Sequence, residues 1–232
     1  MLKTSKMHLP IIFKNEEFIV INKPHGLLVH KTNLAKYELE NAQEILTQQI
    51  ESQVFVTHRL DRKTFGLLIF ALTKDAQKAI NKLFRAKEIT KKYTALVRGF
   101  TEEKGTINYA LKNDDCKVQD AVTHYQTLKH IEIALPFGKH KTSRYSIVEV
   151  EPETGRFHQI RKHFAHIYHP IIGDRPHGCN KQNKLFKEKF AMTKMLLCAT
   201  NLKFSLNEND YEFKIGVSNT FDEVLTAFNQ TS

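Results

Sequence analysis

The chain has 232 residues, 41% of them hydrophobic, and a formal net charge of +10 because 35 Lys and Arg residues outnumber 25 Asp and Glu residues. That length suits one large domain or two small ones, and no apolar run reaches the roughly 18 residues of a membrane-spanning helix. A basic surface on a folded domain indicates a polyanionic partner, above all nucleic acid, with a solubility surface as the simpler alternative.

The first half of the chain mixes short strand and helix patterns. Residues 17–30 predict a β-branched strand, a turn at Pro24 to Gly26 and a second short strand. Residues 41–50 carry apolar side chains at helical spacing, and the continuous apolar run at 66–72 suits a buried strand. Residues 73–88 predict an amphipathic helix with a threonine as its N-cap.

The second half continues in the same mixed order. Residues 91–99 predict a strand that turns alternate side chains to one face, and residues 143–152 predict a strand that ends at a proline. Residues 156–169 and 220–229 carry the apolar stripes of helices. Because strands and helices lack regular β-α-β alternation, we expect an α+β fold: one domain spanning 1–232, with a mixed, largely antiparallel sheet and peripheral helices and loops.

The cysteines and the N-terminus indicate the compartment. Cys116, Cys179 and Cys198 are scattered and include no C-x-x-C pair, so we expect neither a disulfide framework nor a thiolate zinc site. Scattered free thiols suit a reducing cytoplasm. The N-terminal stretch has a short apolar part and no small-residue cleavage site, so we read it as mature protein. We therefore predict a cytoplasmic protein without a membrane partner.

A carboxylate among cations marks the stretch "THRLDRKTFG". Asp61 lies between Arg59 and Arg62, directly before the predicted buried strand, with Gly66 allowing a tight turn. Cations favour the charged form of a neighbouring carboxylate, which a nucleophile or base requires. A salt-bridged loop contact without catalytic role explains the same local pattern.

A second basic stretch lies in "ETGRFHQIRKHFAHIYHPIIGD". Arg156 and Arg161 near the start of a helix would present cations beside a groove, or simply form a solvated basic face. His163, His166 and His169 are spaced to line one helix face, but no carboxylate or cysteine clearly completes a site, so we expect no metal. Motifs for nucleotide hydrolysis, dinucleotide binding and serine hydrolysis do not occur in the sequence.

Four stretches together resemble one family. "HRLDRKTFG" resembles the H-R-L-D-x-x-T-S-G signature of the RluA family of pseudouridine synthases. "NKPHGLLVH", "KKYTALVRG" and "ETGRFHQIRKHFAHIYHPIIGD" are similar to its first motif, its tyrosine motif and its third motif, in the same order. Two positions depart from the family pattern without touching its chemistry: Phe65 replaces the usual serine, and Cys198 stands where relatives often have histidine.

The resemblance implies an isomerase that needs no cofactor. In this family the uracil N1–C1′ bond breaks, the base turns, and C5 joins C1′. The stretch at 175–190 makes the chain most similar to members that modify uridine 65 in the tRNA acceptor stem, without an N-terminal S4 domain. We expect RNA as the partner, with tRNA preferred and no obligate protein partner. Ribosomal RNA is the alternative substrate; a non-catalytic RNA-binding protein and a metal-dependent hydrolase are the alternative functions.

The resemblance also implies roles for individual residues. Asp61 would be the essential carboxylate; whether it attacks the sugar, attacks the base or acts at C2′ stays open. Tyr93 would stack on the target base and serve proton removal from C5, and Arg161 would pair with Asp61. Arg59 would fill the space left when the uridine leaves the RNA stack. The residues expected to contact RNA are Arg59, Arg62, Arg156, His158 and Lys162, with further phosphate contacts from the lysines of residues 181–194.

Overall fold

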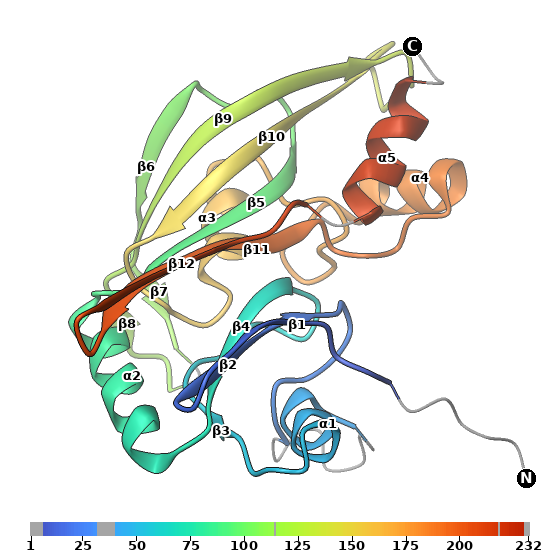
Figure 1. The fold of residues 1–232 in the computed structure, drawn as a ribbon. Helices are drawn as coiled ribbons and strands as arrows, with labels where there is room; N and C mark the ends of the chain where they lie inside the picture. The colour runs from blue at the N-terminus through green and yellow to red at the C-terminus, as the bar shows by residue number, and fades with distance from the viewer. Residues whose placement is uncertain (1–6, 32–39, 114, 218, 230–232) are drawn as a thin grey trace, which may run out of the picture. The chain divides into compact units, whose positions relative to one another are not determined.

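The computed structural model describes residues 7–31, 40–113, 115–217 and 219–229, and the chain divides into two compact units (Figure 1). The first unit comprises Met1–Ile89 and Leu202–Ile215, and the second comprises Thr90–Asn201 and Gly216–Ser232. Strand β11 (Leu197–Leu206) therefore begins in the second unit and ends in the first. Among the described residues, no helix is long and apolar enough to cross a membrane.

The first unit is built on a sheet with the strand order β1-β2-β4-β11, to which β3 adds on β4 and β12 on β11. Strands β1 to β4 pair antiparallel. The elements that complete this unit are β1 (Ile11–Lys14), β2 (Phe18–Lys23), α1 (Ala42–Gln49), β3 (Phe55–Val56), β4 (Phe65–Ala71), α2 (Lys74–Ala86) and β12 (Asn209–Lys214).

Strand β4 and helix α2 confirm the predictions for residues 66–88. All seven residues of β4 are buried, as a continuous apolar run requires. The side chain of Thr73 accepts a hydrogen bond from the backbone N–H of Ala76 at 3.1 Å, so it is the N-cap of α2. Ala76 and Ile80 turn into the core of this unit, where they meet strand β4.

The predicted second strand after the turn at Pro24–Gly26 is wrong. Leu28 makes only an isolated bridge with Asn41, although its neighbours Leu27 and Val29 are buried. The physical reason is that β2 already has a neighbour on each edge, β1 and β4. The chain after the turn therefore has no edge of β2 on which to pair back. The predicted helix at 41–50 is confirmed as α1.

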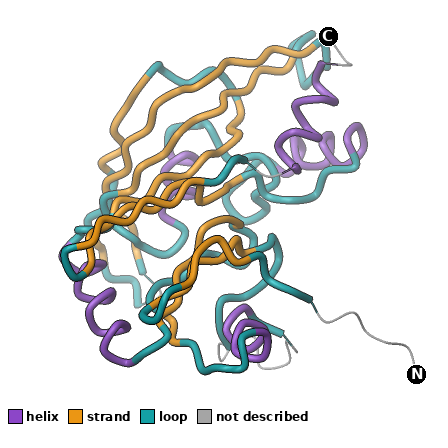
Figure 2. The backbone as a smooth tube through the Cα atoms, in the orientation of Figure 1, coloured by secondary structure: helices purple, strands orange, loops and turns teal. Residues whose placement is uncertain are grey.

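The second unit is built on strands in the order β11-β5-β10-β9-β6, of which β5, β10, β9 and β6 pair antiparallel, with β7 and β8 as a separate ribbon (Figures 1 and 2). The predicted strands 91–99 and 143–152 are confirmed. The elements of this unit besides β11 are β5 (Thr90–Arg98), β6 (Lys104–Asn108), β7 (Leu111–Lys112), β8 (Val118–Gln119), β9 (Val122–Ile133), β10 (Ser143–Pro152), α3 (Gln159–His166), α4 (Asn180–Phe190) and α5 (Asn219–Asn229).

Helix α3 is shorter at both ends than the predicted 156–169. His158 has a left-handed backbone (φ 56°) directly before the helix, and Tyr168 has another (φ 65°) after it. The side chain of Gln159 accepts hydrogen bonds from the Thr154 hydroxyl at 2.6 Å and the Arg156 N–H at 3.0 Å, so residues 154–158 form a turn. This turn leaves His158 and Arg156 outside the helix and Arg161 within it.

Helices α4 and α5 lie side by side (Figure 1), and the sequence predicted only α5. The ring of Phe186 lies 5.4 Å from that of Tyr145 on β10 and 5.8 Å from that of Phe228 on α5. Helix α4 has few other apolar residues, and its exposed side carries lysines. Its sequence therefore lacks a clear apolar stripe from which a helix could be predicted. The mixed, largely antiparallel sheet with helices confirms the α+β prediction, whereas a single domain spanning 1–232 stays a prediction.

Candidate active site

The loop between β3 and β4 presents Asp61 between two exposed cations. Asp61 is half-buried, whereas Arg59 and Arg62 on either side of it are exposed. Leu60 points inward and is 5% exposed, and the backbone N–H of Thr64 donates to the Asp61 carbonyl at 3.0 Å. This hydrogen bond uses the Asp61 backbone carbonyl, so it does not occupy the side-chain carboxylate.

Lys23 at the end of β2 fixes this loop from inside. Its side chain is completely buried, and its Nζ donates to the carbonyls of Pro24 at 3.0 Å, Leu27 at 2.8 Å and Arg62 at 3.1 Å. The Gly26 N–H also donates to the Arg62 carbonyl at 2.9 Å, and Arg62 Nε donates to the Gly26 carbonyl at 2.9 Å. The segment 23–26 and Arg62, the residue after Asp61, are thus joined by these three hydrogen bonds, one from each of three donors.

The buried ammonium group also sets the local electrostatics. Burial lowers the pKa of Lys23 to about 7; the nearby Asp61 carboxylate opposes this shift, and Arg62 adds to it. The charge beside Asp61 therefore changes near neutral pH. Sequence reasoning assigns no role to Lys23, although the motif "NKPHGLLVH" contains it; the available signal is a lysine at the end of a strand of apolar residues.

Two further side chains hold the start of the loop against β4. The Thr57 hydroxyl donates to the Ile69 carbonyl at 2.7 Å, and His58 Nε2 accepts from the Ile69 N–H at 3.1 Å. Phe65, the departure from the family's serine, is 4% exposed as the first residue of β4. Cys198, the second departure, is completely buried in β11. Both substitutions are therefore accommodated within cores.

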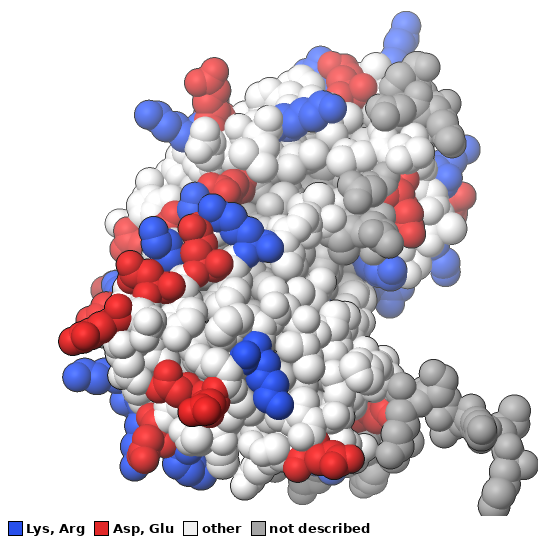
Figure 3. Space-filling model, viewed as in Figure 1, with Lys and Arg blue, Asp and Glu red and all other residues white. Residues whose placement is uncertain are grey.

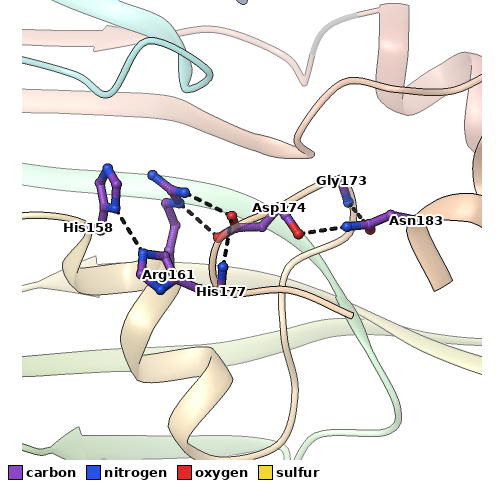
Figure 4. A network of polar contacts seen from close by, with 6 residues as sticks. All are labelled: His158, Arg161, Gly173, Asp174, His177 and Asn183. Carbon is purple, nitrogen blue, oxygen red and sulfur yellow. Dashed lines mark hydrogen bonds and ion pairs between the residues drawn. The ribbon is translucent and has the colours of Figure 1, made fainter. Parts of the chain in front are cut away.

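In the second unit, Arg161 is held by a carboxylate that the sequence did not single out. Arg161 Nε donates to Asp174 Oδ2 and Nη2 donates to Oδ1, both at 2.8 Å (Figure 4). The two side chains are 5% and 1% exposed. This bidentate pair fixes the plane of the guanidinium. The expected pairing of Arg161 with Asp61 stays a prediction, because the two residues belong to different units.

Tyr93 on β5 lies against the apolar core of the second unit. It packs on the cluster that contains Ile160 and Phe164 of α3, together with Leu197 of β11. Ile160 and Leu197 are 7% and 3% exposed, so both are core residues in this unit. Tyr93 thus shares a cluster with the residue that directly precedes Arg161 in α3.

The predicted RNA-contacting residues of this unit surround an exposed aromatic ring. Phe157 is 45% exposed, the His158 ring stacks on it at 3.7 Å, and Lys162 Nζ lies 5.5 Å from its centroid. Arg156 is held differently, since its Nε donates to the Asp120 carbonyl at 3.0 Å. The structure therefore brings His158 and Lys162 together around Phe157, a residue that the sequence analysis had passed over.

The three spaced histidines turn to different partners. His163 Nε2 donates to the Tyr109 carbonyl at 3.0 Å, and His169 Nδ1 donates to the Arg98 carbonyl at 2.8 Å. His166 instead stacks on the Tyr109 ring at 3.7 Å. Within the described ranges, no group of three His, Cys, Asp or Glu residues is placed to hold a metal ion.

The excess of basic residues does not gather into one patch on the face shown in Figure 3. There, Lys and Arg alternate with Asp and Glu and are separated by wide uncharged areas. On helix α4, by contrast, Lys181, Lys184 and Lys187 are all exposed, opposite the buried Gln182 and Phe186. The lysines expected to contact phosphates thus occupy the outer side of this helix.

Comparison with known proteins now defines the class. Residues 17–166 match the family described as RNA pseudouridylate synthase, and the chain belongs to this family. The match confirms the resemblance drawn from the motifs and the prediction of an isomerase that acts on RNA. It covers Asp61, Tyr93 and Arg161, whose individual roles stay predictions.

Individual relatives share a narrower name. The chain is 38% identical over 235 residues to tRNA pseudouridine synthase C of Vibrio parahaemolyticus, covering 96% of each chain. It is 42% identical over 207 residues to tRNA pseudouridine synthase C of Vibrio vulnificus, covering 84% of each. It is 41% identical over 209 residues to tRNA pseudouridine synthase C of Haemophilus ducreyi, covering 86% of each chain.

Two solved structures share the fold. Human RNA Pseudouridylate Synthase Domain Containing 1 has a TM-score of 0.74 at 23% identity, covering 100% of this chain and 98% of that chain. Human RNA Pseudouridylate Synthase Domain Containing 4 has a TM-score of 0.75 at 23% identity, with 95% and 93% coverage. At this identity the likeness concerns the fold alone, and it agrees with the α+β architecture.

Proposed function

We propose that this protein isomerises uridine to pseudouridine in tRNA, at position 65, in the cytoplasm. The relatives named tRNA pseudouridine synthase C support tRNA as the substrate, because they match over most of both chains. The observation that carries the reaction is the loop of Asp61. It offers a half-buried carboxylate on a backbone that buried Lys23 holds still, as preorganised chemistry requires.

On that loop, Arg59 acts in extrusion of the uridine and Asp61 acts in the reaction. A uridine within a folded RNA must leave the stack before a protein side chain reaches it, at a cost of a few kcal/mol. Arg59 is exposed, so it is free to enter the space that the uridine vacates, while Leu60 between them is buried. The Asp61 carboxylate, two residues on, then meets the extruded nucleotide.

Tyr93 and Arg161 complete the proposed reaction. Tyr93 stacks on the target base and serves removal of the C5 proton once C5 has joined C1′. Arg161 orients the Asp61 carboxylate; its guanidinium plane is already fixed by Asp174. Arg62, Arg156, His158 and Lys162 contact the RNA, and phosphate contacts of this kind add affinity and salt dependence without sequence information.

The experiment that tests the proposal is tritium release from transcripts labelled at uracil C5, with tRNA compared with ribosomal RNA fragments and the modified position mapped chemically. We expect release from tRNA at position 65. Release from ribosomal RNA alone would keep the reaction and overturn the substrate. Tight binding without release from either RNA would favour a non-catalytic RNA-binding protein.

The variant Asp61→Asn gives this experiment its internal control. It should abolish release while RNA affinity stays within about tenfold, because phosphate contacts dominate binding. The hydrogen bond from the Thr64 N–H should persist in this variant, since it uses the Asp61 carbonyl. Asp75→Asn, which removes an exposed carboxylate from the first turn of α2, is the matched control. Substantial activity of Asp61→Asn would refute the assignment of the carboxylate.

A further inference from the structure

The Arg161–Asp174 pair is connected to helix α4 by the side chain of Asn183 (Figure 4). The amide oxygen of Asn183 accepts a hydrogen bond from the backbone N–H of Gly173 at 2.9 Å. Its amide nitrogen donates to the carbonyl of Asp174 at 2.6 Å. One amide group thus binds both backbone groups of the turn that supplies the carboxylate for Arg161.

The turn itself is built around this contact. Gly173 has φ +81°, and a Cβ there would lie 2.0 Å from the Lys194 carbonyl oxygen, so only glycine fits. A Cβ on Gly178 would lie 2.0 Å from the Asp174 carbonyl oxygen, the atom that Asn183 binds. The chain at Gly178, two residues before α4 begins, therefore passes close to the Asp174 carbonyl.

Every polar group of Asp174 has a hydrogen-bond partner. Its carboxylate accepts from Arg161 twice and from the His177 N–H at 3.4 Å, and its own N–H donates to the Ile171 carbonyl at 3.3 Å. The only contact from outside the segment 161–178 to Asp174 among these bonds is the one from Asn183. The orientation of Asp174 is therefore the combined result of its own turn and of helix α4.

We propose that Asn183 is a positioning residue for the reaction: through the Gly173–Asp174 turn it sets the orientation of Arg161 and thereby couples helix α4 to catalysis. The proposal rests on the proposed function only in giving Arg161 a part in the reaction. A side chain in a reaction site must be held closely, because small displacements cost large factors in rate. A bidentate guanidinium pair transmits any tilt of the Asp174 carboxylate directly to Arg161.

The adjacent residue supplies a matched control. Gln182 is also on α4 and also binds through its amide, donating to the Tyr145 hydroxyl at 2.5 Å, but it has no bond to the Gly173–Asp174 turn among those described. Gln182→Ala should therefore loosen the packing of α4 on β10 without releasing the turn. Asn183→Ala should release the turn, and the isosteric Asn183→Asp should do the same because it keeps the acceptor for Gly173 and loses the donor to Asp174.

The kinetic test is the single-turnover rate of tritium release from tRNA, measured with the tRNA affinity and the thermal midpoint of each variant. We expect Asn183→Ala and Asn183→Asp to slow the rate about tenfold or more, with tRNA affinity within about twofold. Gln182→Ala should keep its rate within about twofold even if its Tm falls further. The proposal would be overturned if Gln182→Ala and Asn183→Ala lost the same factor in rate. It would also be overturned if neither Asn183→Ala nor Asn183→Asp changed the rate.

A spectroscopic test does not depend on the reaction. The Nε–H of Arg161, identified in a ¹⁵N-arginine spectrum by its loss in Arg161→Lys, should exchange slowly in the wild type because it is buried against Asp174. Asn183→Ala should accelerate that exchange at least tenfold, and Gln182→Ala should not. Unchanged exchange refutes the positioning role. If Asn183→Ala accelerates the exchange but the wild-type protein releases no tritium from RNA, the proposed function is refuted and the positioning of Arg161 by Asn183 is not.

Discussion

In the first unit, three backbone carbonyls hold the buried ammonium group of Lys23, whereas in the second unit the two oxygens of Asp174 hold the buried guanidinium of Arg161. Both arrangements fix a backbone segment next to a candidate site residue. They differ in how the buried charge is compensated. Carbonyl dipoles offset burial only in part, so the pKa of Lys23 falls to about 7, while Arg161 faces a full negative charge.

Because of this difference, Lys23 can lose its charge near neutral pH, whereas Arg161 keeps its charge. An arginine stays protonated under all ordinary conditions, so the support of Arg161 does not change with pH while Asp174 is ionised. Lys23 exchanges its proton near neutral pH, and the field at Asp61 changes with it.

The largest effect on stability is expected from Asp174→Asn. The change leaves the buried guanidinium of Arg161 without its carboxylate, which costs about 3–5 kcal/mol of the free energy of unfolding. Urea denaturation at pH 7 measures this loss. The double variant Arg161→Met with Asp174→Asn should recover more than half of it, because no buried charge remains uncompensated. A single-variant loss below about 1 kcal/mol would contradict the importance of the pair.

Lys23→Met should have a smaller effect of about 2–3 kcal/mol at pH 7. It removes the donor from three carbonyls, but it also removes the cost of burying the ammonium group. Chemical denaturation measures the loss against Lys82→Met, an exposed lysine of α2 whose replacement should stay within about 0.5 kcal/mol. Equal effects of the two changes would show that the carbonyl contacts contribute nothing.

The pH dependence of the Lys23 contribution has a definite sign. The unfolded chain keeps the lysine proton up to about pH 10.5 and the folded chain releases it above about pH 7, so the unfolded state binds more protons in that window. Stability supplied by Lys23 therefore rises with pH there, by about 1 kcal/mol per unit. The stability difference between wild type and Lys23→Met should be constant below pH 7 and widen between pH 7 and 9. A constant difference throughout would refute the lowered pKa.

Local sequence patterns were sufficient to predict the elements whose apolar residues follow a strand or helix period. The apolar run of β4 and the stripe of α2 depend on neighbours within a few residues, so periodicity found them. The strand predicted after Gly26 failed because strand pairing is decided elsewhere in the chain, by β1 and β4. Helix α4 was missed because it packs mainly through Phe186 and shows lysines elsewhere.

The candidate site divides along the same line. Motif resemblance led to Asp61 and Arg161, since their identities lie in contiguous stretches. The residues that hold them lie at a distance: Lys23 is 39 positions from the Arg62 carbonyl that it binds, and Asp174 is 13 positions from Arg161. A single sequence can mark one partner as unusual, as the lysine at the end of β2 does, but it does not show which distant group that partner binds.

Arg59→Ala should have the smallest effect on stability and a selective effect on catalysis. Arg59 is exposed, so unlike Lys23 and Arg161 its loss should change unfolding by less than about 0.5 kcal/mol. Extrusion of the target uridine, followed by stopped-flow fluorescence of a 2-aminopurine placed beside it, should slow about tenfold, because the vacated stack is left unfilled. Initial docking should weaken by less than about threefold, since one phosphate contact at most is lost.

Arg85→Ala at the end of α2 removes the same charge from another exposed position and should leave extrusion unchanged. If the two variants slow extrusion alike, the effect of Arg59 is only its charge, and its assigned place in the RNA is wrong. If Arg59→Ala alone is slow while unfolding is unaffected, then the exposed cation acts on the substrate. The buried cation of the same unit, Lys23, would then act on the loop that presents Arg59, as its burial predicts.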